Sequence, residues 1–458
     1  MQIIKSQGVT RTEQLLFQLC DKSFLQLWSY CNPYNEEKKE FCDLLAVFEN
    51  HVFIFFDREN LQLENIDKDP QVNWERWKRK VIEPQIRTAN GAERYIRNGG
   101  KIFLDKDIQK PFPIPIDTTS IIIHKIIVAH GAKEACLKSS EKNVYGSLAI
   151  SYSSDNIQAP QFPFFVHLDK NQPVHLFDSH NLPIIFGELD TFFDFSSYLD
   201  AKLTAIRKYD LLSYCGEEDL LANYFLNFDE DTNRHFIGTT ENGINGFCIG
   251  EGEWKDFIES TVYKRKKEAD SDSYFWDELI QRTCKNALAG TVGGNANMFA
   301  GPSALLEMAK EPRFVRRALS ERIINSIKNF PETEAKMMRN VSFMQSFYPG
   351  KAYVFLQLKV EGIKDYEKEY RPRRQKMLEI ACGAAKNKFS HLNTIIGIAI
   401  DAPKFTKRNS EDFILMNCSE WTDEDKDYFE KANRSFGFFK SEIAPIERIN
   451  ISEFPKSQ

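Results

Sequence analysis

The chain has 458 residues, of which 42% are hydrophobic and 28% charged, with a formal net charge of −6 at pH 7. This composition excludes a disordered chain, and the negative charge argues against a protein that coats nucleic acid by bulk electrostatic attraction. The nine cysteines form no CxxC pair, which disfavours a disulfide framework and a zinc ribbon. Without a signal-peptide pattern or an apolar run of about 18 residues, we expect a cytoplasmic protein with no membrane span.

A helix is predicted to begin at Thr10, because Leu15, Leu16 and Leu19 follow it at helical spacing. Thr10 and Glu13 match the capping box, in which the glutamate side chain accepts a hydrogen bond from the N-cap amide. The same glutamate is also placed to bind a metal. The sequence leaves both roles open, and substitution by Gln would separate them, because Gln keeps the cap and removes the charge.

A β-hairpin is predicted over residues 41–56, because two apolar runs flank the polar break at residues 49–51. Depending on where the turn is centred, Asp43 lies opposite Phe56 or Asp57. Carboxylates at the Cβ separation of about 5 Å in such a pair repel each other. A hard divalent cation such as Mg²⁺ would relieve this repulsion, because it binds through carboxylate oxygens and substrate phosphates.

The segment after the hairpin predicts an amphipathic helix over residues 74–81, with basic residues between the aromatic and apolar ones. Its basic face either lies in solvent or contacts phosphates beside the acids, and the sequence leaves both open. Pro84 breaks this helix or begins a second one that carries Gln85. For His124 and His130, which lie in apolar strand sequence, satisfied core or edge histidines are the simpler interpretation.

The chain is too long for one ordinary core, and its patterns predict three parts. These are an α/β domain over residues 1–205, a mostly helical region over 206–345 and a small α/β domain over 346–458. In the helical region, four arginines form one basic helix face. For this face, solvent exposure is a simpler interpretation than contact with nucleic acid or an acidic partner. The four are Arg313, Arg316, Arg317 and Arg322.

The candidate site residues follow one another in a defined order: Glu13 on a helix, Asp43 on a strand, Asp57 and Arg58 on the return strand, and Gln85 on the next helix. In this order they resemble the PD-(D/E)XK nucleases with a restriction-endonuclease-like fold, and among these the nuclease-related domains of bacterial proteins. The resemblance covers roughly the first hundred residues. It implies a mixed sheet flanked by helices, with Glu13, Asp43 and Asp57 as metal ligands and Arg58 and Gln85 as further catalytic residues.

The chain departs from this family at the acidic-x-Lys motif. If Arg58 takes the lysine position, the paired acid two residues earlier is Phe56, which cannot bind a metal. If Asp57 is the acid, the lysine position is Glu59, and strand alternation makes the two frames exclusive. The hairpin register favours Asp57 as the ligand, whereas Arg58 and Glu59 both stay open as the third partner.

The resemblance implies a nuclease that uses Mg²⁺ or Mn²⁺ to cleave phosphodiester bonds, with DNA as the expected substrate and a homodimer as one arrangement for double-strand cuts. Arg58 would stabilise charge in place of lysine, since a group with a pKa above about 12 is a poor base. From Trp254 onward the chain is similar to uncharacterised bacterial proteins with a nuclease-related front half. Its later regions would then bind a protein trigger, as in antiviral defence effectors against phage.

Two alternatives stay open at the level of sequence. One is a binding or sensor protein that keeps the nuclease scaffold without its activity, which the phenylalanine and the missing lysine in the motif would explain. The other is a hydrolase that uses a cysteine and a histidine, although no cysteine has an activating neighbour in the sequence.

Overall fold

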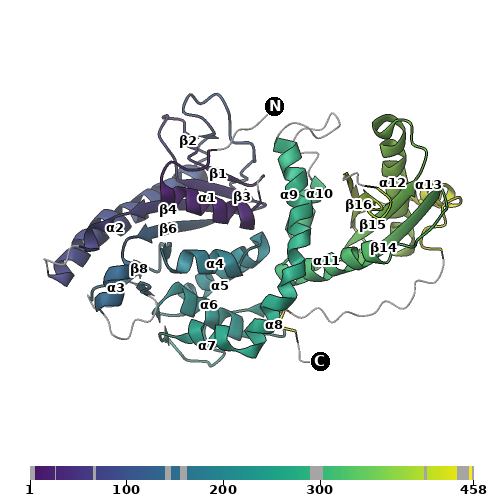
Figure 1. The fold of residues 1–458 in the computed structure, drawn as a ribbon. Helices are drawn as coiled ribbons and strands as arrows, with labels where there is room; N and C mark the ends of the chain where they lie inside the picture. Colours follow the sequence, from purple (N-terminus) through teal and green to yellow (C-terminus); the bar gives the residue numbers. More distant parts are fainter. Residues whose placement is uncertain are drawn as a thin grey trace. The chain divides into compact units, whose positions relative to one another are not determined.

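The computed structural model describes residues 6–25, 27–64, 69–139, 146–154, 162–288, 303–406, 410–440 and 453–455 (Figure 1). It is a mixed α/β protein whose chain divides into two compact units. Unit 1 comprises Met1–Lys264 and Leu288–Thr291, and unit 2 comprises Arg265–Ala287 and Val292–Gln458. The expected domain limits at residues 205 and 345 fall inside a helix and at the end of a strand. In the described ranges, no helix is long and apolar enough to cross a membrane.

Unit 1 is built on a five-stranded sheet with strand order β1-β3-β4-β6-β9. The strands are β1 (Ser29–Cys31), β3 (Leu44–Phe48), β4 (His51–Glu59), β6 (Ile122–His130) and β9 (His175–Asp178). β1 pairs antiparallel with β3, and β3 pairs antiparallel with β4, whereas β4, β6 and β9 run parallel to one another. Because neighbouring parallel strands end at the same edge of a sheet, the ends of β4, β6 and β9 come together there.

The predicted hairpin is confirmed as β3 and β4, in which Phe48 pairs with His51. Glu49 has a positive φ of 53°, as the first central position of a tight two-residue hairpin turn requires. The same register places Asp43, just before β3, opposite Phe56. Both strands are buried through their central residues, as expected for strands that are covered on both faces.

One face of this sheet carries α1 (Arg11–Ser23), α4 (Asn181–Glu188) and α5 (Phe192–Lys208) (Figure 1). The Phe24 ring, at the end of α1, packs there against the rings of Phe53, Phe186 and Phe195 at centroid separations of 5.0, 6.2 and 5.4 Å. Offset and edge-to-face aromatic packing at these distances is favourable. The aromatic residues of the sequence therefore form the core between the sheet and these helices.

The long helix α2 (Pro70–Arg97) covers the opposite face. The odd-numbered residues of β4 face α1, so Arg58 points to the opposite face, toward α2. Its guanidinium donates a 3.1 Å hydrogen bond to the Lys80 carbonyl of α2. Trp74 and Trp77 are fully buried, so the predicted amphipathic helix is confirmed. The helix continues through Pro84, which corrects the expectation of a break or a new helix there.

A second sheet of unit 1 has strand order β13-β10-β7-β8. Its strands are β7 (Ala149–Ser153), β8 (Phe165–Asp169), β10 (Leu211–Tyr214) and β13 (Gly246–Ile249). Short pairs join β2 (Tyr34–Asn35) to β5 (Ile102–Phe103) and β11 (Phe228–Asp229) to β12 (Arg234–His235). The other helices are η1 (Leu61–Glu64), α3 (Lys133–Ser139), α6 (Glu217–Leu226) and α7 (Glu253–Glu259). A buried ion pair of 2.7 Å between Lys202 and Glu217 ties α5 to α6.

Unit 2 contains a four-stranded sheet with strand order β14-β15-β16-β17. Its strands are β14 (Met337–Gln345), β15 (Lys351–Val360), β16 (Thr394–Asp401) and β17 (Glu411–Asn417). Its helices are η2 (Ser271–Ser273), α9 (Tyr274–Leu288), α10 (Ser303–Ala309), α11 (Arg313–Lys328), η3 (Tyr366–Tyr370), α12 (Arg371–Lys388) and α13 (Asp423–Asn433), and α8 (Thr261–Asp270) contains the division between the units. A Cβ on Gly397 would lie 2.8 Å from Cys382 Sγ, so glycine there allows α12 to pack closely on β16.

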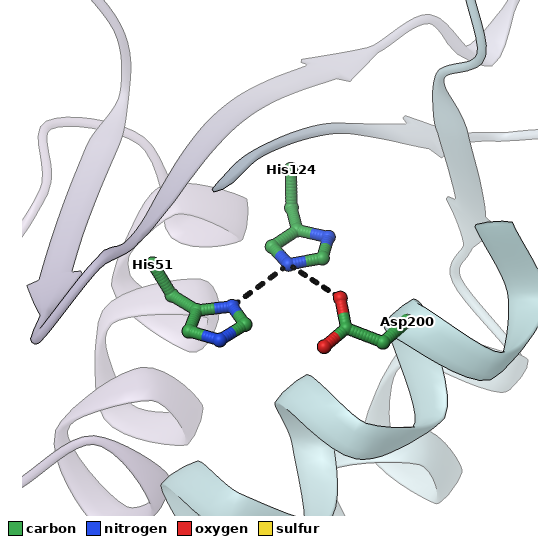
Figure 2. Close-up of side chains that lie close together, drawn as sticks. All are labelled: His51, His124 and Asp200. Atoms are coloured by element: carbon green, nitrogen blue, oxygen red, sulfur yellow. Dashed lines mark hydrogen bonds and ion pairs between the residues drawn. The ribbon is translucent and has the colours of Figure 1, made fainter. Parts of the chain in front are cut away.

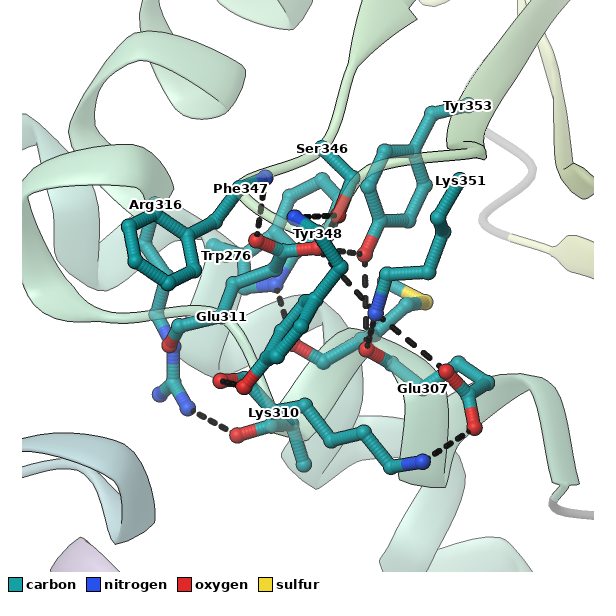
Figure 3. A network of polar contacts seen from close by, with 12 residues as sticks. Trp276, Glu307, Lys310, Glu311, Arg316, Ser346, Phe347, Tyr348, Lys351 and Tyr353 are labelled. Atoms are coloured by element: carbon teal, nitrogen blue, oxygen red, sulfur yellow. Dashed lines mark hydrogen bonds and ion pairs between the residues drawn. The ribbon is translucent and has the colours of Figure 1, made fainter. Parts of the chain in front are cut away.

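A buried polar network connects β15 to the segment between α10 and α11 (Figure 3). Glu311 is fully buried and accepts hydrogen bonds from the Tyr353 hydroxyl at 2.8 Å, from the Phe347 amide at 3.1 Å and from the Ser346 hydroxyl. The ammonium group of Lys351 lies 3.3 Å from the same carboxylate. The buried charge of Glu311 is therefore compensated on several sides, as a charge inside a protein must be.

The expectation that the basic face of α11 lies in solvent is wrong for two of its arginines. Arg313 and Arg316 are 4% and 0% exposed. Their guanidinium groups bind Asp277 of α9 at 2.7 and 2.6 Å. A buried charge is stable only when it is paired, and these two pairs hold α11 against α9. The sequence of α11 alone could not predict them, because the partner aspartate lies on another helix.

Candidate functional site

Two of the predicted acids meet at the open end of the hairpin. The amide of Asp57 donates a 2.6 Å hydrogen bond to Oδ2 of Asp43. The contact joins the carboxylate of one residue to the main chain of the other, because Asp43 lies opposite Phe56 in the ladder and one position away from Asp57. The hairpin thus brings the two acids together through the strand backbone.

Asp43 is surrounded by negative charge. Burial raises the pKa of its carboxyl to about 7, with further increases from the charges of Glu13, Glu40 and Asp57, although the hydrogen bond from the Asp57 amide acts in the opposite direction. We call Glu13, Glu40, Asp43 and Asp57 the acidic edge. These carboxylates have hydrogen-bond donors and one nearby histidine, but their negative charges repel one another, and a bound cation would relieve the repulsion.

Glu13 keeps its capping role and also belongs to this edge. Its Oε2 accepts from the amides of Val9 at 2.7 Å and Thr10 at 3.4 Å, so the capping box is confirmed. The side-chain amide of Asn32 bridges Glu13 Oε2 at 3.5 Å and Glu40 Oε1 at 2.5 Å. The two roles that the sequence left open for Glu13 are therefore compatible in position.

The raised pKa of Asp43 predicts a loss of stability with rising pH in the metal-free chain. Since its pKa is higher in the folded state than in the unfolded state, its contribution to stability is fully present below about pH 4 and is lost as pH rises through about 7. A difference between about 4 and about 7 corresponds to about 4 kcal/mol. We expect Asp43→Asn to be more stable than the wild type at pH 8 but not at pH 4, as measured by urea unfolding in a chelator. A difference that does not vary with pH would contradict the assignment.

The carboxylate of Asp57 is fully buried among groups at the ends of the parallel strands. His130, the last residue of β6, places Nε2 3.1 Å from Asp57 Oδ1. Ser179, directly after β9, places its hydroxyl 2.9 Å from Nδ1 of the same imidazole. An ion that binds the Asp57 carboxylate would therefore have to move His130, whereas within the described ranges no histidine or cation pairs with the Asp43 carboxylate.

Arg58 and Gln85 lie on the α2 face of the sheet. Arg58 is exposed and is bound to α2 through the Lys80 carbonyl. Gln85 is 3% exposed, and its Nε2 donates to the carbonyls of Val81 at 2.8 Å and Val128 at 3.3 Å. Strand alternation turns Asp57 to the opposite face from Arg58. The five predicted site residues are thus divided between the acidic edge and the α2 face.

The acids do not form a compact ligand group by themselves. Among the described residues, Glu13, Asp43 and Asp57 are not a set whose ligand atoms all lie within 4.8 Å of one another. Binding of a common ion would need side-chain movement at this edge. Two further members of the neighbourhood, His130 and Ser179, were not predicted, and the signal for them was their position at or just after the ends of apolar strands.

The comparisons with known proteins do not name a relative. No protein-family model, no curated protein and no solved structure shows a significant match to this chain.

Proposed function

We propose that unit 1 is a divalent-metal-dependent nuclease whose site is the acidic edge. The observation that carries this proposal is the mostly buried carboxyl of Asp43, whose pKa is raised by burial and by the neighbouring charges of Glu13, Glu40 and Asp57. A carboxyl with a strongly raised pKa, close to other carboxylates at a strand end, favours a functional site.

The order of elements supports a restriction-endonuclease-like core. A helix carries Glu13, Asp43 leads into β3, the hairpin returns through Asp57 and Arg58 in β4, and α2 with Gln85 connects to the parallel strand β6. The resemblance predicts this succession of helix, antiparallel strands and crossover helix. We therefore propose this arrangement for the sheet of unit 1.

The donor set of the acidic edge consists of carboxylate oxygens, which Mg²⁺ and Mn²⁺ prefer. Asp43 is the ligand with the best position, and Glu13 and Glu40 lie close enough to influence its charge. When bound, the ion would polarise the phosphoryl group and lower the pKa of a water molecule. The resemblance assigns charge stabilisation to Arg58, and for this role its guanidinium would have to leave the Lys80 carbonyl on the α2 face and reach the acidic edge.

Helix α2 is proposed to hold the nucleic acid. Its residues Arg76, Arg79 and Lys80 are exposed on the surface, and guanidinium and ammonium groups contact phosphates. Since the net charge of the chain is negative, binding would depend on this local patch. Unit 2, which carries none of the acidic edge, is proposed to bind a target or a protein trigger, as a defence effector would require.

The proposal is tested by incubating the full chain with supercoiled plasmid, single-stranded DNA and RNA in Mg²⁺, Mn²⁺ or a chelator. We expect cleavage of DNA in at least one of the two metals and none in the chelator. Intact nucleic acid of all three kinds in both metals would overturn the nuclease.

A catalytically inactive binding or sensor protein is a second candidate. Two observations favour it: Phe56 lies opposite Asp43, and the carboxylate of Asp57 is fully buried beside His130. Retention of DNA binding without cleavage would support it. The cysteine hydrolase has less support, since burial raises the pKa of the thiols of Cys20 and Cys42 and keeps them protonated.

A further inference from the structure

Two histidines and one aspartate from three elements of unit 1 converge at the other end of the central strands. His51 is the first residue of β4, His124 lies near the start of β6, and Asp200 belongs to α5. Figure 2 shows the two imidazole rings and the carboxylate turned toward one another. Asp57 lies six positions after His51 on β4, which is about 20 Å along a strand, so this cluster is separate from the acidic edge.

The distances in the cluster suit a small ion with tetrahedral coordination. His51 Nδ1 lies 3.1 Å from His124 Nε2, which lies 3.6 Å from Asp200 Oδ1. All three atoms lie within 4.8 Å of one another. A tetrahedral Zn²⁺ with bonds of about 2.0 to 2.1 Å holds its ligand atoms about 3.3 Å apart. The spacing of the ligand atoms is close to this value. The two imidazole rings lie nearly in one plane, with an interplanar angle of 1° and a centroid distance of 5.4 Å, so their facing nitrogens point at each other and each ring would have to turn to bind a shared ion.

The protonation states also suit metal binding. Burial lowers the pKa of His51 to about 4 and that of His124 well below its usual value, so both imidazoles are neutral at pH 7. Burial raises the pKa of Asp200 to about 6, which leaves its carboxylate mostly ionised at pH 7. If His124 Nε2 carries a proton, it can donate that proton to His51 Nδ1 or to Asp200 Oδ1, but not to both.

Aromatic side chains pack against both rings. The His124 side chain is 0% exposed and stacks on Phe53 at a centroid distance of 4.9 Å, and His51 meets the Phe192 ring edge-on at 5.5 Å. Asp200 is 44% exposed, so the cluster opens to solvent on the side of α5. Two imidazoles and one carboxylate with an open side match the pattern of three protein ligands and an exchangeable fourth position.

We propose that His51, His124 and Asp200 bind one divalent ion of the Zn²⁺ class, with a fourth position open to water. Nitrogen ligands select this class of ion over Mg²⁺, which prefers oxygen. The ion would connect the amino-terminal ends of β4 and β6 to α5. The site is independent of the proposed nuclease, because it uses other residues and another kind of ion.

The test begins with chelator-treated full chain, to which Zn²⁺ is added in competition with a chromophoric chelator. We expect one tightly bound ion per chain, and Co²⁺ in its place should give the visible absorption of a tetrahedral site. Asp200→Asn and His51→Ala should each weaken Zn²⁺ binding by about tenfold or more. Zn²⁺ should also raise the melting temperature of the wild type, and less so that of either variant.

Matched controls separate this site from other cation binding. Asp210→Asn changes an aspartate that is 72% exposed in the same unit, and Asp43→Asn changes the acidic edge. Both should bind Zn²⁺ like the wild type. No Zn²⁺ binding by the wild type, or equal binding by wild type, Asp200→Asn and His51→Ala, would overturn the proposal and leave a hydrogen-bonded histidine pair. The plasmid assay in Mg²⁺ is a separate readout that Asp200→Asn should not change.

Discussion

Asp43→Asn is expected to lower metal-dependent DNA cleavage by at least about a hundredfold, the scale of losing one group that stabilises transition-state charge. The substitution removes the carboxylate that is best placed to hold the ion and keeps an oxygen that can accept from the Asp57 amide. Initial rates of plasmid nicking in Mg²⁺ and Mn²⁺ measure the effect. Because the variant should be as stable as the wild type or more so at pH 8, unfolding would not explain the loss.

Glu13 and Glu37 provide the comparison. Glu13→Gln keeps an oxygen for the capping box and removes the charge, so a reduced rate would assign Glu13 to the metal site and an unchanged rate would leave it as a cap only. Glu37→Gln removes an exposed carboxylate that pairs with Lys39 and should not change the rate. If Asp43→Asn cleaves DNA as fast as the wild type, the acidic edge is not the catalytic site.

Glu311→Ala is expected to destabilise unit 2 by about 3 to 5 kcal/mol, the cost of breaking a buried ion pair by removal of one partner. The substitution leaves the Lys351 ammonium, which is 5% exposed, with fewer partners. It also removes the nearer acceptor of the Tyr353 hydroxyl, which keeps only the Glu307 carbonyl at 3.4 Å. Glu307 also contacts Lys351, at 3.2 Å. Because this contact still pairs part of the lysine charge, we expect a value near the lower end of the range of about 3 to 5 kcal/mol. Urea unfolding followed by tryptophan fluorescence and circular dichroism measures the change.

Glu361 is the matched control for this experiment. It pairs with Lys359 near the end of the same strand region, but its side chain is 54% exposed. Glu361→Gln should cost less than about 1 kcal/mol, because the Glu361 carboxylate is exposed and the buried Lys359 ammonium keeps its 2.7 Å hydrogen bond to the Thr333 carbonyl. Equal effects of the two substitutions would show that burial of Glu311 does not determine its contribution.

Local patterns predicted the parts of the site that depend on near neighbours in the chain. The capping box of Thr10 and Glu13 and the hairpin that brings Asp43 to Asp57 follow from residues a few positions apart. The same reasoning could not choose between Phe56 and Asp57 as the residue opposite Asp43. That choice depended on a one-residue difference in the centre of the turn, and a shift of one residue reverses the face of every side chain.

Local sequence patterns could not predict the contacts between segments that are far apart in the chain. His124 was expected to be a satisfied core histidine. Its partners are His51, which lies 73 residues earlier in the chain, and Asp200 on α5. Arg316 was expected in solvent, and it is buried because Asp277 of another helix neutralises it. Neither partner can be identified from the residues around the histidine or the arginine.

The sequence by itself determined the first helix, the hairpin and the concentration of acids near the open end of the hairpin, because periodicity, caps and turns act over a few residues. Only the tertiary structure decided which charges are buried and what they meet. The burial that raises the pKa of Asp43, the pairing of Asp57 with His130 and the convergence of His51, His124 and Asp200 all arise when strands and helices far apart in the chain exclude water together.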